Sequence, residues 1–262
     1  MQSKITIVAN WKMHPEKEKD ALILLKEVKK LLLKKHFFDV IIAPPAIYLP
    51  RLQKHTKNKI ELAGQTMHAK DAGAYTGSLS AKMLKQYGAS YVILGHSETR
   101  ATGETNNDVN EKIKSALKVG LIPIVCIGES VRDESHQYLA WLQTEIKETF
   151  SGLPAQALGK IFIAYEPLWA IGENATREAT PEECREIVIY IKRVLTDMYG
   201  AKSTSKIKIL YGGSVDESNA RMMLEEGGVQ GLLVGRASLK PKQFIKLIEA
   251  TAFYNENNKT NW

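Results

Sequence analysis

Polar side chains that could move a proton or hold an anion stand directly after short apolar runs of this sequence. Glu166 ends the run IFIAYE (161–166) and is followed at once by Pro167. Lys12 and His96 occupy similar positions after two other apolar runs. A carboxylate at the edge of a protein core costs free energy unless a partner or a reaction uses it. A base, a cation and an imidazole placed in this way suit general acid–base chemistry on a small anion.

The apolar runs have the continuous hydrophobicity of strands that are covered on both faces. They occupy residues 5–9, 39–43, 60–64, 91–95, 122–128, 161–166, 207–212 and 231–235. Helix-like periodicity fills most of the gaps, most clearly over 20–35, 106–120 and 180–200. Thr180 before Pro181, with Glu183 at capping-box spacing, predicts the start of the last of these helices.

Alternating strands and helices predict parallel strand pairing. Because eight such units follow one another without a linker, the sequence predicts an α/β protein with one closed (β/α)8 barrel over residues 1–254. The polar stretch 255–262 is expected to be a frayed C-terminal tail. An open, doubly wound sheet is the main alternative. Its first turn usually contains GxGxxG, whereas here that turn reads NWKM (10–13).

In a parallel barrel the carboxyl ends of the strands meet at one rim, where catalytic residues belong. The predicted strand ends carry an amide, cations, an imidazole, carboxylates and glycine turns. These residues are Asn10, Lys12, His96, Ser97, Glu98, Glu166, Gly212, Gly213, Ser214, Gly235 and Arg236. Any one of these residues alone is weak evidence for a functional site. Their shared placement at the strand ends is what indicates one.

Most of these residues also have a structural explanation. Lys12 alone is more often a solvated lysine, and His96 alone could equally be a core histidine. Glu98 and Arg100 could form a structural ion pair. The glycines could simply build tight turns. Glu166 is the hardest to explain in this way, because a strand-end acid before a proline has no obvious capping role.

Composition and charge narrow the class of protein. The chain has 262 residues and a formal net charge of +7, with its lysines spread along the helical segments. No aromatic residues interleave with the basic ones, so we expect solvated helix faces and no nucleic-acid partner. The two cysteines, Cys126 and Cys184, argue against a disulfide framework and for a cytoplasmic location. We also expect no membrane segment, no secretory signal and no metal site.

From about residue 5 to residue 248, the chain resembles the triosephosphate isomerase family, whose fold is the TIM barrel. The motifs that carry the resemblance are NWKM (10–13), GQ (64–65), GAYTG (73–77), ILGHSE (93–98), CIGE (126–129), YEPLWAIG (165–172) and LYGGSV (210–215). The resemblance implies that dihydroxyacetone phosphate and glyceraldehyde 3-phosphate are interconverted through an enediolate. It implies no cofactor.

The resemblance also implies roles for individual residues. Glu166 is the expected general base, His96 polarises and protonates substrate oxygens, and Lys12 offsets the charge of the enediolate. Asn10 completes the polar lining, and Glu98 holds Lys12 or His96 in place.

Further implications concern the substrate phosphate and a partner subunit. A mobile lid is expected to begin at Pro167. The loop 73–77 is expected to bring Thr76 near the site of a neighbouring subunit, which implies a homodimer. The implied phosphate-binding residues are Gly172, Gly213, Ser214, Gly235 and Arg236.

Several positions depart from the usual pattern of that family. Ser78 stands where the family has glutamate, and Thr99 where it commonly has arginine. The lid, through residues 173–178, is about two residues longer. Arg236 replaces a common second glycine, and its side chain could bind phosphate or face solvent. Because the changes cluster around the lid and the phosphate turn, isomerisation of the four-carbon erythrulose phosphate stays an alternative. A non-catalytic sugar-phosphate-binding barrel and an aldolase with a Schiff-base lysine are further alternatives.

Overall fold

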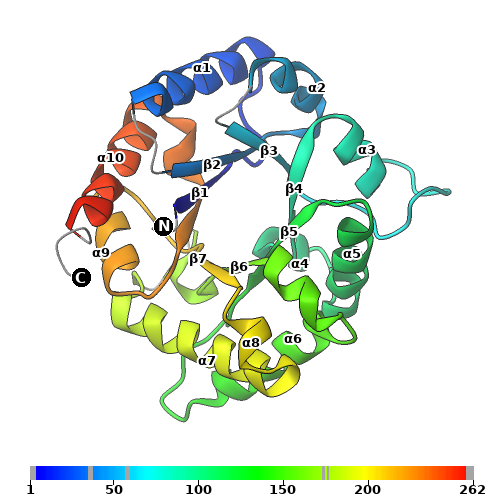
Figure 1. Cartoon of the computed structure of the whole chain (residues 1–262), viewed down its shortest axis with the longest axis vertical. Helices are drawn as coiled ribbons and strands as arrows, with labels where there is room; N and C mark the ends of the chain where they lie inside the picture. Colours follow the sequence, from blue (N-terminus) through cyan, green and yellow to red (C-terminus); the bar gives the residue numbers. More distant parts are fainter. Residues whose placement is uncertain (1–3, 35–37, 57–59, 173–174, 176, 258–262) are drawn as a thin grey trace.

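The computed structural model describes residues 4–34, 38–56, 60–172, 175 and 177–257. Eight parallel strands close into a barrel, in which β1 pairs with both β2 and β8 (Figure 1). This closure excludes the open doubly wound sheet. All eight predicted strands are present, with bounds shifted by at most two residues. The strands are β1 (Ile5–Asn10), β2 (Phe38–Ala43), β3 (Ile60–Gly64), β4 (Ala89–Leu94), β5 (Ile122–Ile127), β6 (Phe162–Tyr165), β7 (Lys208–Tyr211) and β8 (Gly231–Val234).

Helices surround the barrel as an outer ring (Figure 1). The α-helices are α1 (Glu18–Lys34), α2 (Leu49–Leu52), α3 (Ala81–Gln86), α4 (Ser97–Arg100), α5 (Asn106–Lys118), α6 (Gln137–Phe150), α7 (Pro181–Tyr199), α8 (Ala201–Thr204), α9 (Ala220–Glu225) and α10 (Pro241–Asn257). Short 3-10 helices are η1 (Ala46–Tyr48), η2 (Gln53–His55), η3 (Ala155–Lys160), η4 (Leu168–Ala170) and η5 (Arg236–Leu239).

Local sequence sets where the long helices begin. The predicted start of α7 is confirmed: the hydroxyl of Thr180 accepts from the backbone N–H of Glu183, whose carboxylate accepts from the N–H of Thr180. An equivalent capping box of Thr105 and Asp108 begins α5. Each box satisfies N–H groups that the first helical turn leaves unpaired.

The predicted C-terminal tail begins inside a helix, because α10 continues to Asn257. The rest of that tail, residues 258–262, lies outside the described residues, as do Glu173, Asn174 and Thr176 of the longer lid.

The core has two layers that the strands separate. One cluster of buried apolar side chains fills the barrel, from Val8 and Ile41 to Leu210 and Leu233, and includes Cys126. A larger cluster lies between the strands and the helices. Because both faces of each strand are covered, every strand reads as an apolar run and polar residues are displaced to the strand ends.

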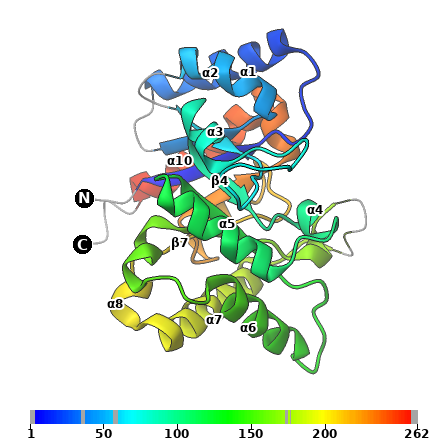
Figure 2. The ribbon, with the colours of Figure 1, turned by 90° about the vertical axis from the view of Figure 1, so that its right-hand side faces the viewer.

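Parallel closure brings all the carboxyl ends of the strands to one rim. Figure 2 shows the barrel from the side, with α4, which follows β4, at one end and α8, which precedes β7, at the other. Among the described residues no helix is long and apolar enough to cross a membrane. The same part of the chain contains no group of three or more histidine, cysteine or acidic residues that could hold a metal ion.

The segment after α4 is tied to α5 by a buried ion pair between Glu104 and Lys112, whose side chains are 6% and 16% exposed. Lys112→Met is expected to lower the free energy of unfolding by about 3 kcal/mol, because it leaves a buried carboxylate without its cation. Denaturant unfolding followed by circular dichroism measures the change.

Lys114→Met is the matched control on the same helix. Lys114 pairs with Glu111, and these side chains are 44% and 49% exposed. Removing an exposed pair is expected to leave the unfolding midpoint unchanged. Equal losses of unfolding free energy in the two variants would show that burial does not increase the contribution of the Glu104–Lys112 pair to stability.

Candidate active site

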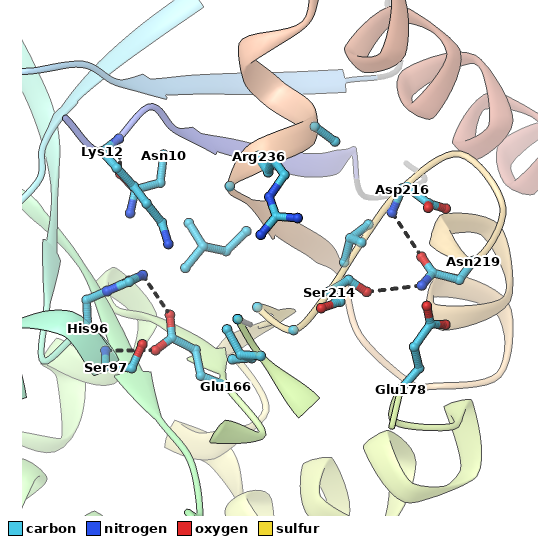
Figure 3. A pocket seen from close by; sticks show the side chains of 18 of the residues that line it. Asn10, Lys12, His96, Ser97, Glu166, Glu178, Ser214, Asp216, Asn219 and Arg236 are labelled. Atoms are coloured by element: carbon cyan, nitrogen blue, oxygen red, sulfur yellow. Dashed lines mark hydrogen bonds and ion pairs between the residues drawn. The ribbon is translucent and has the colours of Figure 1, made fainter. Parts of the chain in front are cut away.

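A polar cavity of about 340 Å³ opens at the carboxyl ends of the strands (Figure 3). Two of the predicted site residues do not line it: Glu98, which contacts it through Lys12, and Thr76. The predicted residues that do line it are Asn10, Lys12, His96, Glu166, Gly172, Gly213, Ser214, Gly235 and Arg236.

The carboxylate of Glu166 is buried and held from two sides. Its residue is 2% exposed. The backbone N–H of Ser97 donates to Oε2 at 3.1 Å, and Nε2 of His96 lies 3.4 Å from Oε1. The sequence places Ser97 at the rim, but a backbone donor cannot be recognised from side-chain types.

The backbone at Glu166 is fixed by the neighbouring strand end. Its N–H donates to the carbonyl of Ile127 at 2.8 Å. A Cβ atom at Gly128 would lie 1.7 Å from the carbonyl oxygen of Glu166, so only glycine allows the two chain segments to approach this closely. The base is therefore held at a position that β5 and β6 set together.

The protonation of His96 follows from its hydrogen bonds. The backbone N–H of Glu98 donates to Nδ1 at 3.2 Å, where α4 begins. A ring nitrogen that accepts a hydrogen bond carries no proton, so the ring is neutral and its proton is on Nε2. That N–H faces the carboxylate of Glu166.

Lys12 is placed by an unusual backbone conformation. Its φ is +52°, in the left-handed region that few residues other than glycine adopt. Oδ1 of Asn10 accepts from the N–H of Lys12 at 3.0 Å, and the amide of Gln65 donates to its carbonyl at 2.7 Å. Gln65 belongs to the motif GQ (64–65), for which no role was predicted. Its position directly after β3 could have indicated a place at the site.

The ammonium of Lys12 pairs with Glu98, with Nζ 2.6 Å from Oε1. Partial burial raises the pKa of Glu98, but the hydrogen bond and charge of Lys12 outweigh it, and the pKa lies below the ordinary glutamate value. The alternative ion pair between Glu98 and Arg100 is wrong. The guanidinium of Arg100 instead donates to the carbonyl of Gly95 at 2.8 Å and lies 3.2 Å from Glu145.

A further buried acid, Glu145, supports the strand end beside Glu166. Burial raises the pKa of Glu145 to about 8 despite the charge of Arg100. Its Oε2 accepts from the N–H of Gly128 at 3.2 Å. Burial also raises the pKa of the Cys126 thiol, and the charge of Glu166 adds to this effect. Cys126 is 1% exposed and packs inside the barrel, as a small apolar residue would.

The first residues of the predicted lid are fastened to Glu129. Its Oε1 accepts from the indole N–H of Trp169 and from the hydroxyl of Tyr165, each at 2.8 Å. Its carbonyl accepts from the N–H of Leu168 at 2.9 Å. Burial raises the pKa of Glu129 in spite of these donors. Glu129 belongs to the motif CIGE (126–129), and its position as a strand-end acid is the sequence signal that could have indicated this role.

The opposite wall of the cavity is the turn after β7. The hydroxyl of Ser214 donates to the carbonyl of Ala170 at 3.1 Å, which joins this turn to η4. The side-chain amide of Asn219 donates to the carbonyl of Ser214 at 3.0 Å. Figure 3 shows the side chain of Arg236 directed into the cavity, between Lys12 and Ser214. Arg236 lines the cavity and is also exposed to solvent.

Thr76 belongs to an exposed loop after β3, away from the cavity. The ring of the adjacent Tyr75 stacks on His68, with ring centroids 3.9 Å apart. The neighbouring loops after β1 and β2 also expose apolar side chains: Met13 is 88% exposed and Ile47 is 78% exposed.

Comparison with known proteins gives the family. The family model described as triosephosphate isomerase matches residues 5–251. A triosephosphate isomerase of Alkaliphilus oremlandii is 41% identical over 94% of this chain and 98% of its own length. One of Dehalococcoides mccartyi is 42% identical over 95% and 97%.

A solved structure agrees with this result. The crystal structure of triosephosphate isomerase from Bartonella henselae superposes with a TM-score of 0.81 at 34% identity, covering 95% of this chain and 99% of that one. The chain therefore belongs to the triosephosphate isomerase family.

Proposed function

We propose that this protein interconverts dihydroxyacetone phosphate and glyceraldehyde 3-phosphate. The observation that carries the proposal is the meeting of Glu166, His96, Lys12 and Asn10 around one polar cavity. The relatives described above bear the name triosephosphate isomerase, and none of them is named for a four-carbon substrate. We therefore favour the three-carbon phosphate over erythrulose phosphate.

The reaction moves one proton between adjacent carbons. The Glu166 carboxylate takes a proton from the carbon next to the substrate carbonyl, and the electrons of that C–H bond form an enediolate. The carboxylic acid then returns the proton to the neighbouring carbon. Because carbon acids of this kind are weak, the developing oxyanion must be stabilised as it forms.

His96 and Lys12 supply that stabilisation. The Nε2–H of His96 is a neutral donor that can polarise the carbonyl, pass its proton to the carbonyl oxygen, and take a proton back from the hydroxyl oxygen on the adjacent carbon. This family is the usual example of a glutamate base beside a neutral histidine, and here the tautomer follows from the bond at Nδ1. Lys12 offsets the negative charge, and Glu98 orients its ammonium. No metal or organic cofactor takes part in these steps.

We place the substrate phosphate beside Gly172, Gly213 and Gly235, which line the far wall of the cavity. Backbone N–H groups at such turns bind phosphate without desolvating a charged side chain. The hydroxyl of Ser214 already donates to Ala170, so we assign Ser214 its backbone N–H as the phosphate donor.

Glu166→Asp is expected to lower kcat at least about 100-fold while KM changes little, because the shorter side chain withdraws the base from the substrate carbon. The coupled assay of glyceraldehyde 3-phosphate formation measures both constants. Glu182→Asp, an exposed change at the start of α7, is the control and should leave kcat unaltered. A wild-type kcat in Glu166→Asp would contradict the assignment of Glu166 as the base.

We also propose a homodimer in which the loop 73–77 meets a second copy of the chain. Exposed apolar side chains after the first three strands support this face: Met13 and Ile47, then Tyr75, Met83 and Tyr87, which are 43%, 45% and 46% exposed. The buried, unbridged cysteines accord with the reducing cytoplasm, where we propose that the protein acts.

Tyr75→Asp is expected to convert the dimer to a monomer in sedimentation velocity, because it places an acid on the apolar face. Val131→Asp is the control, since Val131 is 62% exposed in the loop after β5, outside this face. A wild-type chain that sediments as a monomer, or equal effects of the two variants, would contradict the proposed interface.

A further inference from the structure

The charges that line the cavity are nearly balanced. Its acidic side chains are Glu166, Glu178 and Asp216, and its basic side chains are Lys12, Arg236 and Lys240. A cavity with this balance has little net attraction for a dianion. Binding therefore depends on which of the cations are already engaged by acids of the protein.

Lys12 is engaged. Its ammonium lies 2.6 Å from Glu98, so part of its charge is already offset. Asp216 accepts from the N–H and the hydroxyl of Ser218 at 2.7 and 2.6 Å, which turns its carboxylate into its own loop. Arg236, in contrast, makes no hydrogen bond or ion pair with any of the described residues, although its side chain points into the cavity (Figure 3).

The position of Arg236 relates it to the phosphate turn. It directly follows Gly235, and a Cβ atom built on Gly235 would lie 3.5 Å from Cε of Lys12. The phosphate turn therefore packs against the lysine, and the next side chain enters the same space. Lys240 lies beyond η5 and is farther along the chain from this turn.

We infer that Arg236 binds the phosphate dianion of the substrate through its guanidinium, as a side-chain donor added to the backbone N–H groups of the phosphate turn. A guanidinium presents paired N–H donors that match phosphate oxygens, which a backbone turn alone does not supply. The inference rests on the proposed function, because it concerns the same cavity and substrate. It gives a role to the arginine that replaces the second glycine common in this family.

The inference separates recognition of the phosphate from proton transfer. Arg236 lies across the cavity from the carboxylate of Glu166 (Figure 3). Its loss should therefore weaken binding of any ligand that carries the dianion. It should leave untouched the isomerisation of glyceraldehyde, which has the same reacting carbons and no phosphate.

Arg236→Ala is expected to lower kcat/KM for dihydroxyacetone phosphate about 10- to 100-fold, since charge-assisted hydrogen bonds are lost. The value of kcat/KM for unphosphorylated glyceraldehyde should stay within about twofold. Added guanidinium chloride, at concentrations well below those that unfold the protein, should restore part of the lost activity. Sodium chloride at equal ionic strength should not.

Arg236→Lys and Lys242→Ala complete the set of variants. The first keeps the charge but not the paired donors, so its kcat/KM should fall between those of the wild type and Arg236→Ala. The second removes an exposed cation of α10 that does not line the cavity, and wild-type constants are expected. Equal losses with glyceraldehyde and the phosphorylated substrate, or no loss in Arg236→Ala, would overturn the inference.

Calorimetric titration with inorganic phosphate distinguishes this inference from the proposed function, because it needs no turnover. Arg236→Ala should weaken phosphate binding by about the same factor as it lowers kcat/KM. A wild-type protein that binds phosphate through Arg236 but does not isomerise the triose phosphates would refute the proposed activity and leave the anion site standing. Unchanged phosphate affinity in Arg236→Ala would refute the site itself.

Discussion

The buried carboxylate of Glu166 is the constraint on which the rest of the site depends. At 2% exposure, the carboxylate receives little hydration, so protein donors must replace the water it has lost. The N–H of Ser97 donates to the carboxylate at 3.1 Å, Nε2 of His96 lies 3.4 Å from it, and both residues follow the end of β4.

Several neighbouring features follow from that requirement. His96 can donate to Glu166 only as the Nε2 tautomer, and the N–H of Glu98 selects this tautomer through Nδ1. The same residue, Glu98, holds the ammonium of Lys12 through its side chain. One short turn after β4 therefore fixes the imidazole with its backbone and the cation with its carboxylate. The imidazole and the cation are therefore both positioned by one residue, Glu98.

The sequence predicts the architecture well because its signals are local and repeated. Continuous apolar runs mark the strands, and Thr180 with Glu183 marks a helix start that the structure has. Polar residues at strand ends predict which side chains meet, since parallel closure brings those ends together. Pairings between strand ends are not local, and there the sequence says less. Residue types and spacing alone leave Arg100 as a possible partner of Glu98, and only the family resemblance pointed to Lys12 or His96; the structure has the pair with Lys12.

The buried acids at this end of the barrel show why such pairings cannot be predicted from residue types alone. Glu129, Glu145 and Glu166 are all buried, at 1%, 1% and 2% exposure, and the charges of Glu166 and Glu129 each raise the pKa of Glu145. Three ionised carboxylates in one low-dielectric region would repel one another strongly. Arg100, whose guanidinium lies 3.2 Å from Glu145, offsets one of those charges. Because Glu145 also accepts from the N–H of Gly128, it keeps the β5 end in place, while its pairing with Arg100 limits its repulsion of the negative charge that Glu166 needs as a base.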